Sequence, residues 1–212
     1  MSDAAATVRR ELEPEDQARA EFYALFARLF ADAPDASLLR AIADAPALAP
    51  AARADDAGGN GLASAWDDLR AASAATAPEA VREEFQALFV GVGRSEVSLY
   101  ASHYVGPQSG RPLAELRASL ARLGLARRAE SNEFEDHLSL VLETMRMLVA
   151  GDGDRPPTPL GEQKTFFDRH LLPWTTDCCT AISMNSVANY YRRVAECTQC
   201  FVGLERDSFA LE

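Results

Sequence analysis

Apolar residues along this chain recur three and four positions apart, which is the spacing of one face of an α-helix. The clearest stripe ends at a proline break and consists of Phe22, Leu25, Phe26, Leu29 and Phe30. Similar spacing predicts further helices over residues 37–45, 62–75, 78–90, 112–124 and 133–149, and from 160 to about 204. No segment alternates apolar and polar residues for long enough to require a strand. The pattern therefore predicts an all-α protein with a single globular helical domain.

Proline and glycine divide the predicted domain into three parts. The run from Gly151 to Pro159 is the clearest linker in the sequence. We expect residues 1–150 to form an N-terminal helical part and residues 151–160 to act as a linker or hinge. Residues 161–212 should form a C-terminal helical hairpin that packs on the first part. A hinge of this kind is also a candidate site for domain swapping into a homodimer.

A second segment without helical spacing lies between Gly91 and Pro112. It carries serines and two tyrosines, Tyr100 and Tyr104, among glycines and prolines. Long ordered loops in compact domains are usually functional. We therefore expect this loop to contribute to a binding site.

Polar residues gather where the apolar run before Gly151 begins. Asn132 followed by Glu135 has the spacing of a capping box, which predicts that the helix starts at Glu133 and ends at Gly151. The carboxylates and the imidazole of His137 would then lie on the first helical turn. An acid there interacts favourably with the helix dipole whether or not a ligand is bound. The residues alone leave two readings open, a stabilised helix start or a ligand site.

The charge of the chain excludes some partners. The formal net charge is −11, with 32 acidic against 21 basic residues. Binding to nucleic acid or to an anionic membrane requires clustered lysine and arginine, so neither is expected. A basic peptide is the partner that such a surface attracts, unless the charge serves only to keep the protein in solution.

No targeting segment is expected. The first 20 residues carry charged residues in place of an apolar core, so they do not form a signal peptide. No apolar run reaches the roughly 20 residues that a membrane-spanning helix needs. We therefore expect a cytoplasmic protein.

The four cysteines are Cys178, Cys179, Cys197 and Cys200. Structural disulfides are not expected in a reducing compartment. Cys197 and Cys200 have the spacing of half a zinc site. The side chains of Cys178 and Cys179, which are adjacent in the chain, would point about 100° apart on a helix, so both would rarely face one ion. We expect buried thiols in place of a metal site, and no cofactor.

Four sequence elements together resemble the TorD/DmsD family of cytoplasmic chaperones for molybdoenzymes. They are Phe22-Tyr23-Ala-Leu25-Phe26-Ala-Arg-Leu29-Phe30, Phe85-Gln-Ala-Leu88-Phe89-Val-Gly91 followed by Ser98-Leu99-Tyr100, Glu133-x-x-Asp136-His137-Leu138, and His170-Leu171-x-x-Trp174. Each element alone is weak, but their order and separation match over residues 20 to 205.

The resemblance implies an all-helical protein that is not an enzyme. It implies a chaperone that binds the twin-arginine signal peptide and the apo catalytic subunit of a molybdoenzyme, assists cofactor insertion and delays export. Dimethyl sulfoxide, trimethylamine N-oxide, nitrate and formate enzymes would present similar leaders. The signal-peptide groove would lie in residues 1–150 and would use Glu133, Glu135, Asp136, His137, Phe89, Ser98, Leu99 and Tyr100.

The chemistry of a twin-arginine leader agrees with this set. Two guanidinium groups pair well with carboxylates, and the apolar stretch after them needs an apolar groove. Glu133, Glu135 and Asp136 would supply the carboxylates, with Asp136 as the anchor. Phe89, Leu99 and Tyr100 would supply the apolar walls.

The sequence departs from the family pattern at two positions. Phe134 stands where the family usually has the proline of its Glu-Pro-x-Asp-His motif, and Ser95 stands where a proline commonly precedes the loop serine. Proline at a helix start makes the chain entry rigid. Its replacement suggests a divergent loop geometry and a different client.

Three other functions fit the sequence less well than the chaperone does. A hydrolase dyad of Asp136 and His137 is disfavoured because adjacent side chains diverge on a helix. A metal site of His103, His137 and His170 is disfavoured because the three lack the paired spacing of helical metal motifs. A nucleotide-binding module would need a phosphate cradle, which the sequence does not show.

Overall fold

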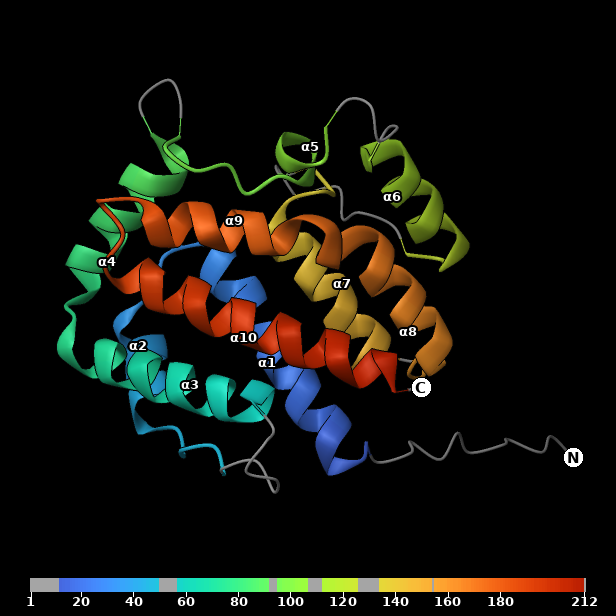
Figure 1. The fold of residues 1–212 in the computed structure, drawn as a ribbon, viewed down its shortest axis with the longest axis horizontal. Coiled ribbons are helices and arrows are strands. Elements are labelled where there is room, and N and C mark those ends of the chain that lie inside the picture. Colours follow the sequence, from blue (N-terminus) through green and yellow to red (C-terminus); the bar gives the residue numbers. More distant parts are fainter. Residues whose placement is uncertain are drawn as a thin grey trace, which may run out of the picture.

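The computed structural model describes residues 12–49, 57–91, 95–106, 112–125, 134–153 and 155–211. All regular elements within these ranges are helical, so the predicted fold class is confirmed (Figure 1). In chain order they are α1 (Pro14–Ala31), α2 (Ala36–Asp44), α3 (Ala57–Ala75), α4 (Pro78–Phe85), the π-helical turn η1 (Gln86–Val90), α5 (Ala101–Tyr104), α6 (Pro112–Arg122), α7 (Leu138–Ala150), α8 (Leu160–Phe166), the π-helical turn η3 (Phe167–Leu171), α9 (Leu172–Met184) and α10 (Tyr190–Ala210).

Helix α1 forms the centre of the bundle. It packs along α7 and also contacts α10, which crosses it in Figure 1. Its side chains Tyr23, Phe26, Leu29 and Phe30 are all 0% exposed. Three of these belong to the apolar stripe that predicted the helix, so burial of that stripe is what holds α1 in the core.

Several of the remaining helices pack around α10. Helix α10 packs against α3 on one side and α9 on the other, and α2 packs against α3. Helices α9 and α10 run in opposite directions (Figure 1) and are joined by residues 185–189. Among the described residues, no helix combines the length and the apolar character that crossing a membrane requires.

A π-helical turn connects α8 to α9, and a proline explains its position. Pro173 lies in the first turn of α9, directly after η3. Proline has no backbone N–H and clashes with the preceding turn of a regular α-helix. The wider π turn accommodates this break, so residues 160–184 are helical without interruption.

The predicted linker is held in place by several contacts. Gly151 ends α7 with φ of 76°, which confirms its predicted role as the helix stop. Asp152 and Arg155 form an isolated antiparallel bridge. The Arg155 guanidinium donates to the carbonyls of Leu123 and Gly124 beyond α6, at 2.6 and 2.8 Å. The division at 151–160, the hinge and the swapped dimer stay predictions.

The start of α7 was predicted wrongly. The helix begins at Leu138 with His137 as its N-cap, five residues after Glu133. Asn132 and Glu133 lie outside the described residues, so the predicted capping box is not placed. Residues 134–137 form a turn, in which the His137 N–H donates to the Phe134 carbonyl at 3.0 Å. His137 itself is extended, with φ of −68° and ψ of 137°.

A contact with the distant loop explains the later start. Tyr100 and His137 form an antiparallel bridge. The Leu138 N–H donates to the Leu99 carbonyl at 2.8 Å, and the Ala101 N–H donates to the Asp136 carbonyl at 3.0 Å. These bonds hold His137 in extended backbone, so the helix cannot begin before it.

Candidate functional site

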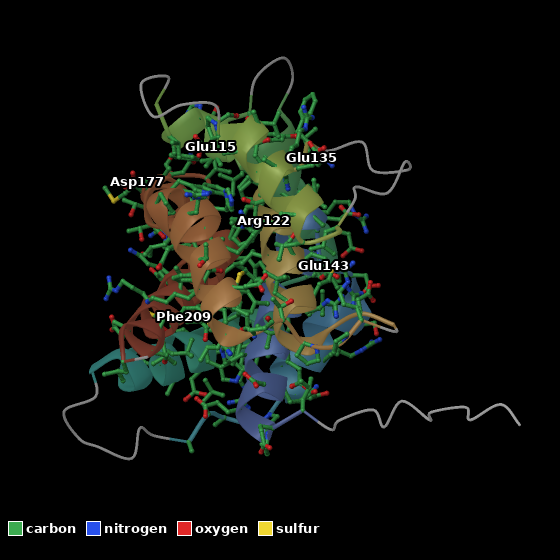
Figure 2. All side chains as sticks on the ribbon, turned by 90° about the vertical axis from the view of Figure 1, so that its right-hand side faces the viewer. Glu115, Arg122, Glu135, Glu143, Asp177 and Phe209 are labelled. Carbon is green, nitrogen blue, oxygen red and sulfur yellow. The ribbon has the colours of Figure 1, made fainter. Side chains whose placement is uncertain are left out.

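We use the name loop cluster for the described residues that were predicted to bind the leader, which are Phe89, Ser98, Leu99, Tyr100, Glu135, Asp136 and His137. The Tyr100–His137 bridge brings the last five of these together. Figure 2 places Glu135 at the upper end of the molecule. Sequence reasoning therefore identified a true spatial neighbourhood, formed by segments 37 positions apart at the bridge.

Asp136 faces inward. The residue is 2% exposed, and its Oδ2 accepts the Ser102 N–H at 3.0 Å. Ser102 lies in the first turn of α5, so the carboxylate caps that short helix. Its role as the anchor of a leader arginine stays a prediction, and that role would require this buried contact to open.

His137 is occupied with the start of α7. Its Nδ1 lies 2.7 Å from Ser139 Oγ and 3.3 Å from the Ser139 nitrogen. Its ring meets the Tyr100 ring edge-on, with centroids 5.0 Å apart. A hydrolase dyad with Asp136 is not supported, because both side chains hold backbone groups at helix starts.

Glu135 lies at the edge of the cluster. Its carboxylate pairs with the Arg117 guanidinium of α6 at 2.9 Å. Hydrogen bonding to Glu135 outweighs desolvation and raises the pKa of Arg117. Its neighbour Phe134, which replaces the family proline, is 56% exposed. Glu135 therefore links the turn before α7 to α6, while Phe134 faces the solvent.

The predicted apolar walls lie deeper than expected. Leu99 is 3% exposed and belongs to the core. Phe89 is partly buried and packs edge-on against Phe85 and Tyr191, with centroids 5.2 and 5.0 Å apart. Tyr100 is partly buried. Of the three, Leu99 supports the loop from within.

A pocket of about 570 Å³ lies on the α9 side of this loop. We call it the loop pocket, and Ser98 is the loop-cluster residue in its lining. Exposed Met184 follows one helical turn after Ala181 on α9. The lining consists of Ser95, Glu96, Val97, Ser98, His103, Tyr104 and Ala181.

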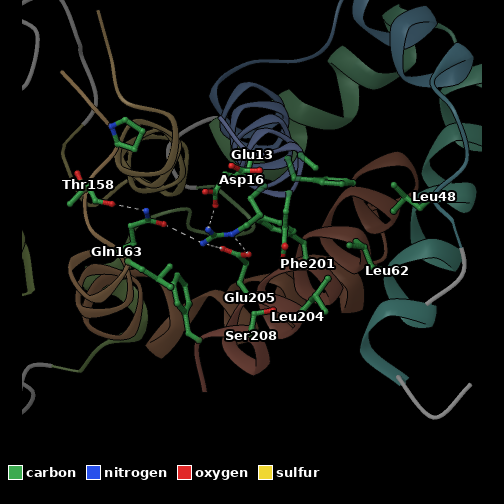
Figure 3. Close-up of a pocket in the computed structure, with 17 residues that line it drawn as sticks. Glu13, Asp16, Leu48, Leu62, Thr158, Gln163, Phe201, Leu204, Glu205 and Ser208 are labelled. Carbon is green, nitrogen blue, oxygen red and sulfur yellow. Dashed lines mark hydrogen bonds and ion pairs between the residues drawn. The ribbon is translucent and has the colours of Figure 1, made fainter. Parts of the chain in front are cut away.

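A second pocket, of about 750 Å³, lies where the ends of several helices meet (Figure 3). We call it the α1–α10 pocket. Sequence reasoning missed it, because its residues come from helices far apart in the chain. The only local signal was the acidic start of α1. The lining consists of Glu13, Glu15, Asp16, Ala18, Arg19, Phe22, Leu48, Leu62, Pro157, Thr158, Leu160, Gln163, Phe201, Leu204, Glu205, Ser208 and Phe209.

A buried ion pair forms one side of the α1–α10 pocket (Figure 3). Arg19 donates to both carboxylate oxygens of Glu205, at 2.8 and 2.9 Å, and to Asp16 at 2.8 Å. The Tyr23 hydroxyl donates to Glu205 at 2.8 Å. Burial alone would lower the pKa of Arg19, but its bonds to Glu205 and Asp16 raise the pKa. Glu205, 3% exposed, therefore keeps its charge balanced inside the protein.

The cysteines are thiols, and three of them are buried. Cys178, Cys179 and Cys197 are 0% exposed and Cys200 is partly buried. Burial raises the pKa of Cys178 to about 12, so this thiol is protonated at neutral pH. No group of three metal-ligating side chains occurs among the described residues.

His170 has a structural environment. Its Nε2 lies 2.8 Å from Ser119 Oγ of α6, and its carbonyl accepts the Trp174 indole N–H at 2.7 Å. Burial, and then the charges of Arg169 and Arg122, lower its pKa to about 4. His170 is therefore neutral near pH 7 and connects η3 to α6.

Comparison with known proteins identifies the family. The family model of the nitrate reductase delta subunit matches residues 55–180, which is more than half of the chain. The chain is similar to a perchlorate reductase assembly chaperone protein of Dechloromonas aromatica (strain RCB), 26% identical over 61% of this chain and 63% of the relative. It is also similar to the chaperone protein TorD of Aliivibrio fischeri (strain ATCC 700601 / ES114), 29% identical over 43% of this chain and 46% of the relative.

The chain spans less than two thirds of the length of either relative. The comparisons therefore show the family but not the activity of the whole protein. The motifs that resemble TorD and DmsD proteins lie in and around the matched region. The chain belongs to the nitrate reductase delta subunit family, within its TorD/DmsD-like proteins.

Proposed function

We propose that this protein is a cytoplasmic chaperone for a molybdoenzyme. It would bind the twin-arginine leader and the apo catalytic subunit, assist insertion of the cofactor and delay export. The observation that carries the proposal is family membership, together with two relatives whose names are those of chaperones, one of them for reductase assembly.

The charge and shape of the molecule support this proposal. A net charge of −11 attracts a cationic leader over a distance and speeds its encounter with the protein. The structure also has two pockets with carboxylates in their linings, Glu96 in one and Glu13, Glu15 and Asp16 in the other. A chaperone that handles both a leader and a catalytic subunit needs more than one such contact surface.

The loop cluster stays part of the proposal as a contact surface for the client. Tyr100 and Glu135 lie at its partly buried edge, and Glu96 lies in the adjoining loop pocket. Asp136 contributes by fixing the start of α5, and thereby the shape of the pocket wall at His103 and Tyr104.

Isolation of the natural complex tests the function. The tagged protein, purified from cells that produce the client, should carry a reductase catalytic subunit with its leader still attached and without molybdenum cofactor. Mass spectrometry identifies the subunit and its N-terminus, and elemental analysis measures molybdenum. Recovery of processed, cofactor-loaded enzyme alone, or of no reductase subunit beyond a tag-only control, would contradict the proposal.

A further inference from the structure

We propose that the α1–α10 pocket, and not Asp136, binds the twin-arginine part of the leader. This inference rests on the proposed chaperone function and adds the location of the leader. The occupant is an arginine-bearing segment with apolar residues directly after the arginines, because the pocket offers carboxylates at its rim and apolar side chains on its floor.

The floor of the pocket is apolar and rigid. Phe22 of α1 stacks on Phe201 of α10, with ring centroids 5.3 Å apart. Leu62 of α3 and Leu204 of α10 extend this surface, and Leu48 lies at its far side (Figure 3). Phe201 and Leu62 are 2% and 5% exposed and anchor the floor in the core, whereas Phe22, Leu48 and Leu204 are partly buried and present apolar surface to the pocket. Apolar leader side chains would bury further surface here without rearranging the protein.

The rim of the pocket is acidic. Glu13 and Glu15 lie at the exposed start of α1, and neither forms an ion pair with any described residue. Asp16 is partly neutralised by Arg19, and Glu205 balances the same guanidinium from below. Within the described residues the carboxylates of Glu13 and Glu15 have no cationic partner, so two incoming guanidinium groups would pair with them through charge-assisted hydrogen bonds.

The buried Arg19 sets the orientation of the segment. Its guanidinium is fixed on the polar side of the pocket by Glu205, Asp16 and Gln163. A second cation close to this charge would be repelled. The leader arginines therefore bind at the rim beside Glu13 and Glu15, while the apolar residues bind on the floor at Phe22 and Leu204.

The loop pocket meets these requirements less well. Its lining holds one carboxylate, Glu96, and otherwise mainly serines, His103 and Tyr104. Apart from Tyr104, its apolar lining residues are Val97 and Ala181, which are small. Carboxylates and an extended apolar floor occur together in the α1–α10 pocket, and this combination decides between the two.

Calorimetry with synthetic leader peptides tests the inference. One peptide carries Arg-Arg and the other Gln-Gln in the same sequence. The double variant Glu13→Gln/Glu15→Gln should bind the Arg-Arg peptide about fivefold more weakly than the wild type, with the loss reduced by added salt. Its affinity for the Gln-Gln peptide should equal that of the wild type, because this peptide lacks the arginines with which Glu13 and Glu15 would pair.

Three further variants locate the contact. Glu79→Gln/Glu83→Gln removes the same charge from the exposed surface of α4, outside both pockets, and should leave affinity unchanged. Leu204→Ala should weaken binding of both peptides at every salt concentration. Glu96→Gln tests the loop pocket. Thermal unfolding of each variant confirms that the fold is retained.

The outcomes separate the two proposals. Unchanged Arg-Arg affinity in Glu13→Gln/Glu15→Gln, or an equal loss in the α4 control, would overturn the pocket assignment and leave the chaperone function standing. A loss confined to Glu96→Gln would place the leader in the loop pocket and also overturn the assignment. A wild-type protein that binds neither peptide would contradict leader binding itself.

Discussion

Glu84 shows how one side chain can determine where a distant helix begins. Its carboxylate accepts the N–H groups of Asn189, Tyr190 and Tyr191, at 2.9, 3.0 and 2.7 Å. These are the donors left unpaired at the start of α10, where a negative charge is also favoured by the helix dipole. No local sequence pattern indicates this contact, because Glu84 and α10 are more than 100 residues apart.

The first prediction concerns this cap. Replacing Glu84 with Ala should lower the free energy of unfolding by about 2 kcal/mol, because three backbone donors lose their acceptor. Urea denaturation of the variant measures the change. Glu83→Ala on the exposed face of the same helix is the control, with an expected change within about 0.5 kcal/mol. Equal effects of the two changes would show that the cap does not contribute.

A second prediction distinguishes the two roles of Asp136. Asp136→Ala should reduce unfolding free energy by about 1–3 kcal/mol, because the Ser102 N–H loses its partner in a buried setting. Asp136→Asn keeps an oxygen acceptor and should retain most of the stability and all of the leader affinity. If Asp136→Asn instead keeps full stability but loses leader binding, the carboxylate charge contacts the leader and the capping interpretation is insufficient.

His170 provides a prediction on pH. Its folded pKa of about 4 lies below its ordinary value of 6.5, so the unfolded chain binds the proton more readily than the folded protein. The contribution of His170 to stability is therefore fully present above pH 6.5 and is lost as pH falls from 6.5 to 4. Unfolding measured across this range should show a shallower pH dependence in His170→Gln. An identical profile would mean that His170 titrates normally.

At the scale of elements, local patterns predicted helices well and their ends less well. The aromatic stripe of α1 predicted its buried face, because apolar side chains at helical spacing specify one surface. The start of α7 was misplaced because the capping pattern at Asn132 and Glu135 describes only local hydrogen bonds. The Tyr100–His137 bridge, which involves a segment far away in sequence, decides the backbone there instead.

The linker gives a prediction at this scale. Gly151 and Gly153 both have positive φ, at 76° and 57°. A Cβ at Gly151 would collide with the Arg155 carbonyl, whereas one at Gly153 would meet no atom within 4 Å. Gly153→Ala should cost about 1 kcal/mol for the backbone conformation alone, and Gly151→Ala should cost clearly more. Equal losses in thermal unfolding would show that the Arg155 turn yields to the added methyl group.

At the scale of the whole molecule, the sequence predicted the fold class and the family but not the pockets. The four motifs are local, so they were visible in a single chain. The α1–α10 pocket requires Glu13, Leu62, Gln163 and Leu204 to meet, and no periodicity relates these positions. The predicted site at the loop was partly assembled as expected, yet burial of Asp136 depends on packing that spacing does not encode.

The bond between Arg19 and Glu205 joins residues 186 positions apart, close to the two ends of the described chain. During synthesis the first helix leaves the ribosome long before the last one has been translated. The Arg19 guanidinium, without Glu205 as its partner, and the aromatic rings beside it therefore stay exposed to water until α10 emerges. A nascent copy of this protein therefore has no completed α1–α10 pocket, and no binding there, until α10 has left the ribosome.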